Sequence, residues 1–324
     1  MSERGLDTRL GVLLAMIVLV AVIWAMAFVS KHFERVAAAV APIEAIAPEQ
    51  LSVIVAGSGG TFENPVRRGP ALVAALGKDL ALFDAGRAVA DGLRLAAVPV
   101  SQPRAVFLSS LLPENTAGLD DLWLQAWLEG AEAPLVVYGP EGTAELVAAL
   151  TTAHARGAAA QAAGFALAPE GGRIEAREIE DGAAIEVGAL RVRAFALAGG
   201  PLPAFAYRVE GGGRAYAFAG ATWDPDAVVR AAEKADVLAI EGVYRASLDM
   251  AAEVGLDIAL LRKEAERHVA LEDVGALATR ASVRSVLLAR LRPPPAFHYQ
   301  YEDIVEASFR GPVRIAEDGE TITP

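Results

Sequence analysis

One uninterrupted apolar run near the N-terminus limits what this chain can fold into more than any other feature. The run extends from Leu10 to Val29 without a charged side chain, and about 20 apolar residues in a helix can cross the ~30 Å hydrocarbon core of a bilayer. We therefore expect residues 1–35 to form a transmembrane anchor whose span covers about residues 10–29. A cleavable signal peptide is the alternative, but its apolar region usually has only ~7–15 residues.

The charges on either side of this run bear on its orientation. Arg4 and Arg9 precede it, and Lys31 and Arg35 follow it, so the positive charge that marks the cytoplasmic side is nearly balanced. We predict a single-pass inner-membrane protein of a bacterium, with the N-terminus inside and the C-terminal domain in the periplasm. Residues 36–50 are rich in Ala and Pro, and we expect them to form a short helical stalk and linker.

The rest of the sequence, residues 51–324, has the composition of a domain with a large core. The chain of 324 residues is 54% hydrophobic, which is enough to build one large domain. Its formal net charge of −12 would repel a phosphate backbone, so we expect no nucleic acid among its partners. The absence of cysteine excludes disulfides and thiolate metal ligands.

Short β-branched apolar runs alternate in this domain with segments of helical periodicity. Residues 51–56 are typical of a buried strand, and residues 119–128 carry apolar side chains at helical spacing. A helix is also expected at 87–97, and another follows the turn that ends at Thr143 and continues to about residue 153. A further helix is expected from Pro225 onward, with Asp224 as its N-cap. Further strands are expected at 71–76, 80–84, 104–108, 174–179, 190–197, 205–209, 215–219, 236–241 and 284–289. This alternation predicts an α/β fold.

The segment from Phe107 to Leu119 lies where a buried strand should give way to a helix, and it reads F-L-S-S-L-L-P-E-N-T-A-G-L. It resembles the T-H-x-H-x-D-H-x-x-G-L motif of the metallo-β-lactamase superfamily with the metal ligands exchanged. The glycine-rich loop 57–60 and the segment Arg68-Gly-Pro70 are similar to motifs of the RNase Z and arylsulfatase-like branches. The resemblance implies a metallo-β-lactamase-like αββα sandwich over residues 51–324, behind an N-terminal transmembrane helix.

The resemblance also locates the positions that would bind two metal ions, and nearly all of them have lost a ligand. In chain order these seven positions hold Ser110, Leu112, Glu114, Asn115, Ala198, Ala221 and Arg290. Zinc sites need about four N, O or S donors. We therefore expect zinc to be lost, with no other metal or cofactor in its place and no metal-activated water.

Three polar residues of the implied pocket are retained. Asp84 matches the aspartate of the D-x-G turn, where the resemblance implies support of the metal loop; alternatively, Asp84 only caps a turn at a strand end. Glu241 matches the acidic residue of an H-E-A strand end. His268 matches a histidine on the substrate side of the pocket, or is simply a polar residue ahead of a helix. We also predict that Arg290 takes the structural place of the cation and pairs with Glu114 or Asp84.

These observations predict a membrane-anchored, catalytically inactive member of the superfamily that binds a small-molecule ligand or a protein partner. The alternative is a hydrolase of phosphodiesters, sulfates or other esters, with Asp84, Glu114 and His268 as catalytic candidates. A structural subunit of an envelope complex is a third possibility. The expected ligand pocket consists of Asp84, Ser110, Leu112, Glu114, Asn115, Ala198, Ala221, Glu241, His268 and Arg290.

Overall fold

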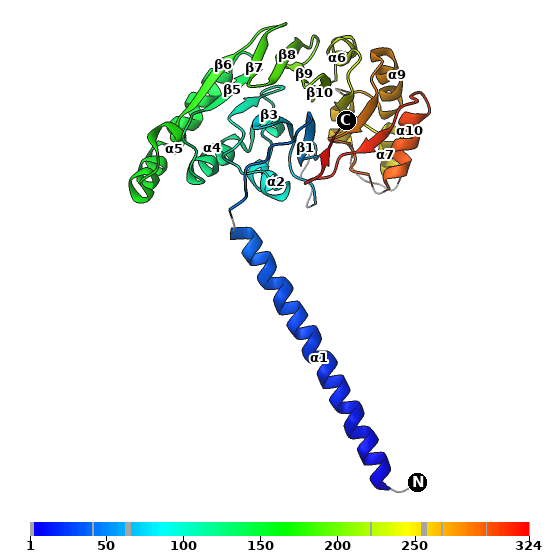
Figure 1. Cartoon of the computed structure of the whole chain (residues 1–324). Coiled ribbons are helices and arrows are strands. Elements are labelled where there is room, and N and C mark those ends of the chain that lie inside the picture. The colour runs from blue at the N-terminus through cyan, green and yellow to red at the C-terminus, as the bar shows by residue number, and fades with distance from the viewer. Residues whose placement is uncertain are drawn as a thin grey trace. The chain divides into compact units, whose positions relative to one another are not determined.

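The computed structural model describes residues 3–40, 42–61, 66–220, 222–253, 258–266, 268–295 and 297–323. By its internal contacts the chain divides into two units, Met1–Ile43 and Glu44–Pro324. The first unit consists of one helix, and the second holds two β-sheets and the other helices (Figure 1).

The first unit is helix α1, Glu3–Val40. Its segment Val12–Glu34 is long and apolar enough to cross a membrane, and its described side chains are exposed rather than packed against protein. A signal sequence close to an N-terminus has the same properties. The helix therefore includes the predicted apolar span and continues into the segment expected to form a helical stalk.

The first sheet contains seven strands, and its central strands are buried on both faces. The strands are β1 Ser52–Gly57, β2 Ala71–Leu76, β3 Asp79–Phe83, β4 Ala105–Phe107, β5 Leu135–Gly139, β6 Ile174–Glu178 and β14 Thr321–Ile322. Their order is β14-β1-β2-β3-β4-β5-β6. Strands β1 to β3 pair antiparallel, and β3 to β6 pair parallel. The continuous apolar sequence of β2 follows from this burial, because neither face meets water.

The second sheet also contains seven strands. They are β7 Ala184–Val187, β8 Leu190–Ala196, β9 Phe205–Gly211, β10 Arg214–Ala219, β11 Val237–Ile240, β12 Ser285–Leu288 and β13 Val313–Ile315, in the order β13-β12-β11-β10-β9-β8-β7. Strands β7 to β10 pair antiparallel, whereas β10 to β13 pair parallel. The predicted site residues lie at the edges where several of these strands end. These strands are β1, β3 and β4 in the first sheet and β8, β10, β11 and β12 in the second.

Helices cover the outer face of each sheet (Figure 1). Helices α2 Val89–Leu95, α4 Leu119–Leu128 and α5 Thr143–Phe165 pack on the first sheet, and α6 Pro225–Ala232, α9 Leu271–Ala281 and α10 His298–Glu306 pack on the second. The shorter helices are α3 Pro113–Thr116, α7 Arg245–Glu253, α8 Ala259–Ala265 and the 3-10 helix η1 Pro169–Gly172. At the start of α6 the Asp224 carboxylate accepts a hydrogen bond from the Ala227 amide, which confirms the predicted N-cap.

Most of the core lies in three apolar layers, one between the sheets and one beneath each set of helices. Aromatic rings fill the centre of the middle layer, where Phe83 lies 5.5 Å from Phe107 and 5.6 Å from Phe218 between ring centroids. The Tyr207 hydroxyl, on β9, also donates a hydrogen bond to the Leu108 carbonyl at 2.7 Å, which ties the sheets together. The predicted αββα sandwich is confirmed.

The structure differs from the predicted elements at helix α5, at three short edge strands and at helices α7, α8 and α10, which were not predicted. Helix α5 continues to Phe165, although the sequence predicted fraying after about residue 153. Its alanines favour helix strongly enough to offset Gly157 and Gly164. Strands β7, β13 and β14 were not predicted, because runs of two to four residues at sheet edges carry little periodicity.

Candidate functional site

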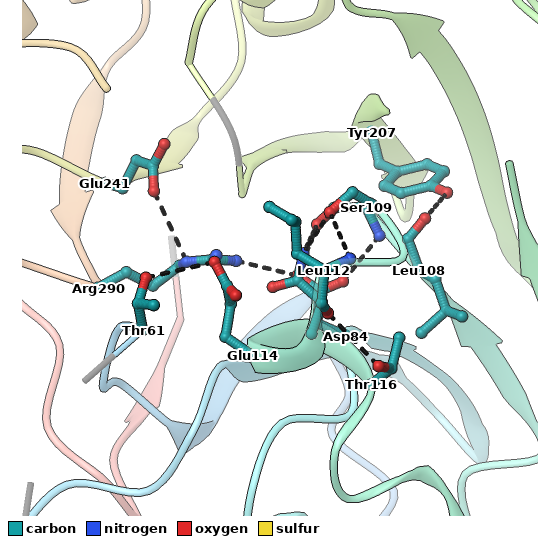
Figure 2. Close-up of polar contacts among 12 residues, drawn as sticks. Thr61, Asp84, Leu108, Ser109, Leu112, Glu114, Thr116, Tyr207, Glu241 and Arg290 are labelled. Atoms are coloured by element: carbon teal, nitrogen blue, oxygen red, sulfur yellow. Dashed lines mark hydrogen bonds and ion pairs between the residues drawn. The ribbon is translucent and has the colours of Figure 1, made fainter. Parts of the chain in front are cut away.

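The candidate site lies where strands of both sheets end. Asp84 directly follows β3, and Glu241 directly follows β11. Ser109 lies two residues after the end of β4, and Arg290 lies two residues after the end of β12. Because these strands share a direction within each sheet, their carboxyl ends meet at one edge. This topology brings residues that are far apart in the sequence into a single buried cluster (Figure 2).

Asp84 is fixed by hydrogen bonds from the strand next to its own. The residue is fully buried and has a left-handed backbone with φ of 60°. Its Oδ1 accepts the Ser109 amide at 2.7 Å, and its Oδ2 accepts the Ser109 hydroxyl at 2.8 Å. Burial raises the pKa of Asp84 to about 6, although Arg290 and the Ser109 donors act in the opposite direction. Asp84 therefore supports the loop after β4, as the resemblance implied.

Arg290 is the buried cation of the cluster. Its Nη1 lies 3.1 Å from Oδ2 of Asp84, and its Nε lies 3.7 Å from Oε2 of Glu241. The Arg290 side chain is only 2% exposed, and the backbone has φ of 55°. Of the two predicted partners of Arg290, Asp84 is confirmed. Glu241 is a further carboxylate partner that was not predicted.

Glu241 connects the two arginines of the site to His268. One carboxylate oxygen accepts hydrogen bonds from Nδ1 of His268 at 2.5 Å and from the Thr222 hydroxyl at 2.9 Å. The other accepts Nη1 of Arg292 at 3.0 Å. Burial by itself would raise the pKa of Glu241, but the positive groups of His268, Arg292 and Arg290 together lower it to about 2. Glu241 is therefore ionised at neutral pH.

The loop after β4 carries a second polar network. Asn115, on α3, donates from its side-chain amide to the hydroxyls of Ser109 at 3.1 Å and Ser110 at 2.8 Å. The Ser110 hydroxyl also accepts the Leu112 amide at 3.3 Å. These hydroxyls contact Asp84, Asn115 and the backbone, and neither contacts His268 in the described structure. Ser110 therefore lacks the base that a serine nucleophile needs.

The other predicted pocket residues lie at different distances from this cluster. Glu114 is half-buried on α3 and accepts a hydrogen bond from the Thr61 hydroxyl at 3.3 Å. Leu112 occupies the N-cap position of α3, a backbone role. Ala198 is exposed, and its amide donates to the Asp224 carboxylate at 3.0 Å, so the structure does not bring its side chain into the buried cluster. Ala221 lies outside the described residues.

Arg292, Thr222 and Ser109 were not predicted to belong to the site. Arg292 contacts Glu241, the Arg290 carbonyl at 3.0 Å and the Thr61 hydroxyl at 2.8 Å. Arg292 stands only two residues after Arg290, but strand alternation does not apply to this pair, because Arg290 has a left-handed backbone with φ of 55°. Thr222 and Ser109 gave no signal either, since their roles depend on contacts with distant strands.

The metal centre that the resemblance implies can be tested against these side chains. Within the described ranges, no group of three or more His, Cys, Asp or Glu side chains is arranged to hold a metal ion. The buried carboxylates of Asp84 and Glu241 both pair with Arg290, whose fixed charge would repel a divalent cation. The residues present therefore do not fit a zinc centre, which needs about four donors.

Two cavities open beside the buried cluster. One of about 240 Å³ is lined by the loop 58–61, by Arg67 and by the segment 288–295. The other, of about 420 Å³, is bordered by Gly199–Pro201, Thr222, Trp223, Arg245 and His268 among others. The arrangement as a whole can bind polar ligands, and among the described side chains it offers no paired nucleophile and base.

Comparison with known proteins identifies relatives of the whole domain. A family model for the beta-lactamase superfamily domain matches residues 81–289, more than half of the chain. Ribonuclease Z of Mycobacterium bovis is 26% identical over 274 residues, which are 83% of this chain and 96% of that protein. Ribonuclease Z of Mycobacterium tuberculosis is 27% identical with the same coverage.

Solved structures share the same fold. The metallo-beta-lactamase fold protein YhfI from Bacillus subtilis matches with a TM-score of 0.65 and 20% identity, covering 84% of this chain and 99% of that one. Human tRNase Z, short form, matches with a TM-score of 0.61 and 20% identity, covering 85% of this chain and 100% of that one. At this identity the likeness concerns the fold.

Proposed function

Since this chain belongs to the metallo-β-lactamase superfamily, we propose that it is a membrane-anchored member in which buried arginines replace the metal centre. In this proposal the protein binds a ligand or a protein partner at the altered site and does not catalyse hydrolysis. Helix α1 supplies the anchor, and the C-terminal domain faces the bacterial periplasm.

The observation that carries this proposal is the position of Arg290. Its guanidinium lies between Asp84 and Glu241, which come from different sheets, and forms ion pairs with both carboxylates (Figure 2). A buried carboxylate pair without a cation would be strongly destabilised, because each charge loses its hydration. A permanently charged arginine therefore supplies the positive charge that the fold needs at this place, without the Lewis acidity or the activated water of a metal.

The second arginine strengthens the argument. Arg292 contacts Glu241 at 3.0 Å and has a side chain that is 6% exposed. Arg290 and Arg292 both form ion pairs with Glu241, so its negative charge is already balanced. Glu241 would therefore bind a divalent cation only weakly. In this proposal the protein keeps Asp84, Glu241 and His268 of the site, and the residues at the metal-ligand positions have been exchanged.

Zinc titration of the full-length protein in detergent tests this proposal. A ligand that binds only the folded state raises the melting temperature by mass action. Because we propose that zinc does not bind, zinc should leave the melting temperature unchanged. The same preparation should hydrolyse no phosphodiester, aryl sulfate or carboxylic ester above the rate of a protein-free blank. A saturable stabilisation by zinc, together with zinc-dependent turnover, would overturn the proposal.

A hydrolase is the second candidate, and one contact favours it. Nδ1 of His268 lies 2.5 Å from Glu241, and His268 borders the cavity of about 420 Å³. A carboxylate that orients an imidazole is a common arrangement for a general base. Under this alternative, a substrate panel gives turnover that His268→Ala abolishes at a temperature where circular dichroism shows that the variant is still folded. Absence of turnover at every pH from 5 to 9 excludes it.

We further propose that nucleic acid is not the partner, although the relatives named above are ribonucleases. The net charge of −12 disfavours a polyanion. The long exposed end of α5, residues 151–165, carries His154 and Arg156 as its only basic side chains. Transfer RNA should therefore show no saturable binding at physiological salt, whereas binding that weakens steeply as salt increases would contradict this proposal.

A further inference from the structure

The cavity of about 240 Å³ beside the buried cluster is bordered by arginine, and its character differs from that of the whole molecule. We name it the arginine cavity; its lining is Ser58–Thr61, Arg67 and Leu288–Pro295. Arg67, Arg290 and Arg292 belong to this lining, and the described lining contains no Asp or Glu. A protein of net charge −12 thus has a cavity whose described charges are all positive.

Arg67 is the cation most available to a ligand. Its Nη1 donates to the Ser58 hydroxyl and the Ala316 carbonyl, each at 2.7 Å. No carboxylate within the described ranges forms an ion pair with it, in contrast to Arg290 and Arg68. The two hydrogen bonds fix the side chain, so little conformational entropy is lost when a ligand binds. The rest of its fork can donate to an anionic oxygen.

Arg292 belongs to the segment Leu288–Pro295, which lines the same cavity. Its guanidinium is held by Glu241, by Thr61 and by the Arg290 carbonyl. Gly60 lies directly beside it, since a Cβ at that position would make an ordinary contact with Cζ of Arg292 at 3.5 Å. The fork of Arg67 can bind a carboxylate or phosphate group, whose planar or tetrahedral oxygens match it, and the fixed charge of Arg292 lies at the same cavity.

The remaining walls of the cavity are apolar. Leu288, Leu291 and the three prolines Pro293–Pro295 supply them. A free inorganic ion would leave these walls without a partner, whereas an organic anion would bury apolar surface against them. The volume lies below the roughly 300–1,000 Å³ of pockets for drug-sized molecules, so the ligand must be compact.

We propose that the arginine cavity binds a compact organic anion, a carboxylate or phosphate monoester with a small apolar body. Arg67 donates to the anionic group, Arg292 adds positive charge beside it, and Leu291 with Pro293–Pro295 contacts the apolar body. This inference rests on the proposed function, because it names the ligand class of the altered site. Screening by physiological salt, with a Debye length of about 8 Å, keeps the distant acidic surface from cancelling the local charge.

Isothermal titration of the full-length protein in detergent with benzoate, phenyl phosphate and neutral benzamide tests the proposal at constant ionic strength. At least one of the two anions should bind saturably, about tenfold or more tighter than benzamide, which corresponds to ~1.4 kcal/mol. If one anion binds, it identifies the anionic group that the cavity accepts. The proposal is overturned if neither anion binds, or if benzamide binds equally well.

Matched variants locate the binding site. Arg67→Gln should weaken anion binding at least tenfold and Arg67→Lys less, whereas Arg156→Gln, which removes the same charge from the exposed helix α5, should leave it unchanged. Pro294 is exposed, so Pro294→Glu tests the cavity without removing a structural contact; it should weaken binding, and Pro294→Gln should not. Anion binding by both Arg67→Gln and Pro294→Glu that is as tight as binding by the unaltered protein would overturn the proposal. Bound metal measured on the same samples reports separately on the proposed function.

Discussion

Arg290 and Asp84 join the two sheets of the domain, with Nη1 of the arginine 3.1 Å from Oδ2 of the aspartate. Asp84 follows β3 of the first sheet and Arg290 follows β12 of the second. Both side chains are buried, at 2% and 0% exposure. The contact is therefore an ion pair across the site edge of the sandwich, and its removal should affect the stability of the whole domain.

Arg290→Ala should be strongly destabilising. It leaves Asp84 and Glu241 buried with less compensation, and removing one partner of a buried pair typically costs about 3–5 kcal/mol. Urea denaturation followed by tryptophan fluorescence measures the change. The matched control is Arg284→Ala, which removes an arginine that pairs with Asp236 but is 75% exposed. A loss below ~0.5 kcal/mol for Arg290→Ala, as expected of a surface residue, would contradict the assignment.

Glu241→Gln should destabilise the site from the opposite side. The variant keeps the shape of the side chain but leaves Arg290, Arg292 and His268 without their common negative charge, so we expect a loss of about 3–5 kcal/mol. Glu186→Gln is the control, since Glu186 is 66% exposed on β7. Equal effects of the two substitutions on the free energy of unfolding would show that the Glu241 contacts are not important.

The pH dependence of stability should have two opposing parts. Glu241 has its pKa lowered to about 2, so the folded state binds fewer protons than the unfolded state and stability rises from about pH 2 to pH 4.5. Asp84 has its pKa raised to about 6, so its contribution falls as pH rises from about 4 to 6. In thermal melts across this range, the Asp84→Asn variant should not show this fall in stability between pH 4 and pH 6. A fall that persists unchanged in that variant would disagree with the burial of Asp84.

Gly220→Ala should disturb the arginine directly. A Cβ at Gly220 would lie 2.8 Å from the Ser109 hydroxyl and 2.9 Å from Nη1 of Arg290, and such crowding typically costs about 1–3 kcal/mol. Gly157→Ala is the matched control, because its Cβ would enter open space on helix α5. That substitution should stabilise the protein by roughly 0.5–1 kcal/mol. Melting temperatures that move in the same direction for both variants would argue against a crowded site at Gly220.

The fold was largely predictable from the sequence, because buried strands such as β1 and β2 carry continuous apolar runs with glycine at their ends. The pairing of Arg290 with Asp84 was predicted as one of two alternatives, because the resemblance put Arg290, Asp84 and Glu114 at one site. Strand order alone could not predict it, since β3 and β12 lie in different sheets. The short strand β14 was not predictable, since two residues carry no pattern.

The contacts around Glu241 were less accessible to sequence reasoning. Thr222, His268 and Arg292 approach it from 19, 27 and 51 positions away. No local spacing indicates which of these side chains turns toward the carboxylate, because that choice depends on how the loops pack. Ala198 illustrates the same limit: its motif position predicted a place in the pocket, but it is exposed beside Asp224.

Elemental analysis of the full-length protein, purified without chelators from cells grown with added zinc, iron and manganese, tests the central claim most directly. The account predicts far less than one equivalent of any transition metal per chain, because Arg290 holds the charge between Asp84 and Glu241. Near-stoichiometric metal, accompanied by hydrolysis that chelation abolishes and metal restores, would contradict it.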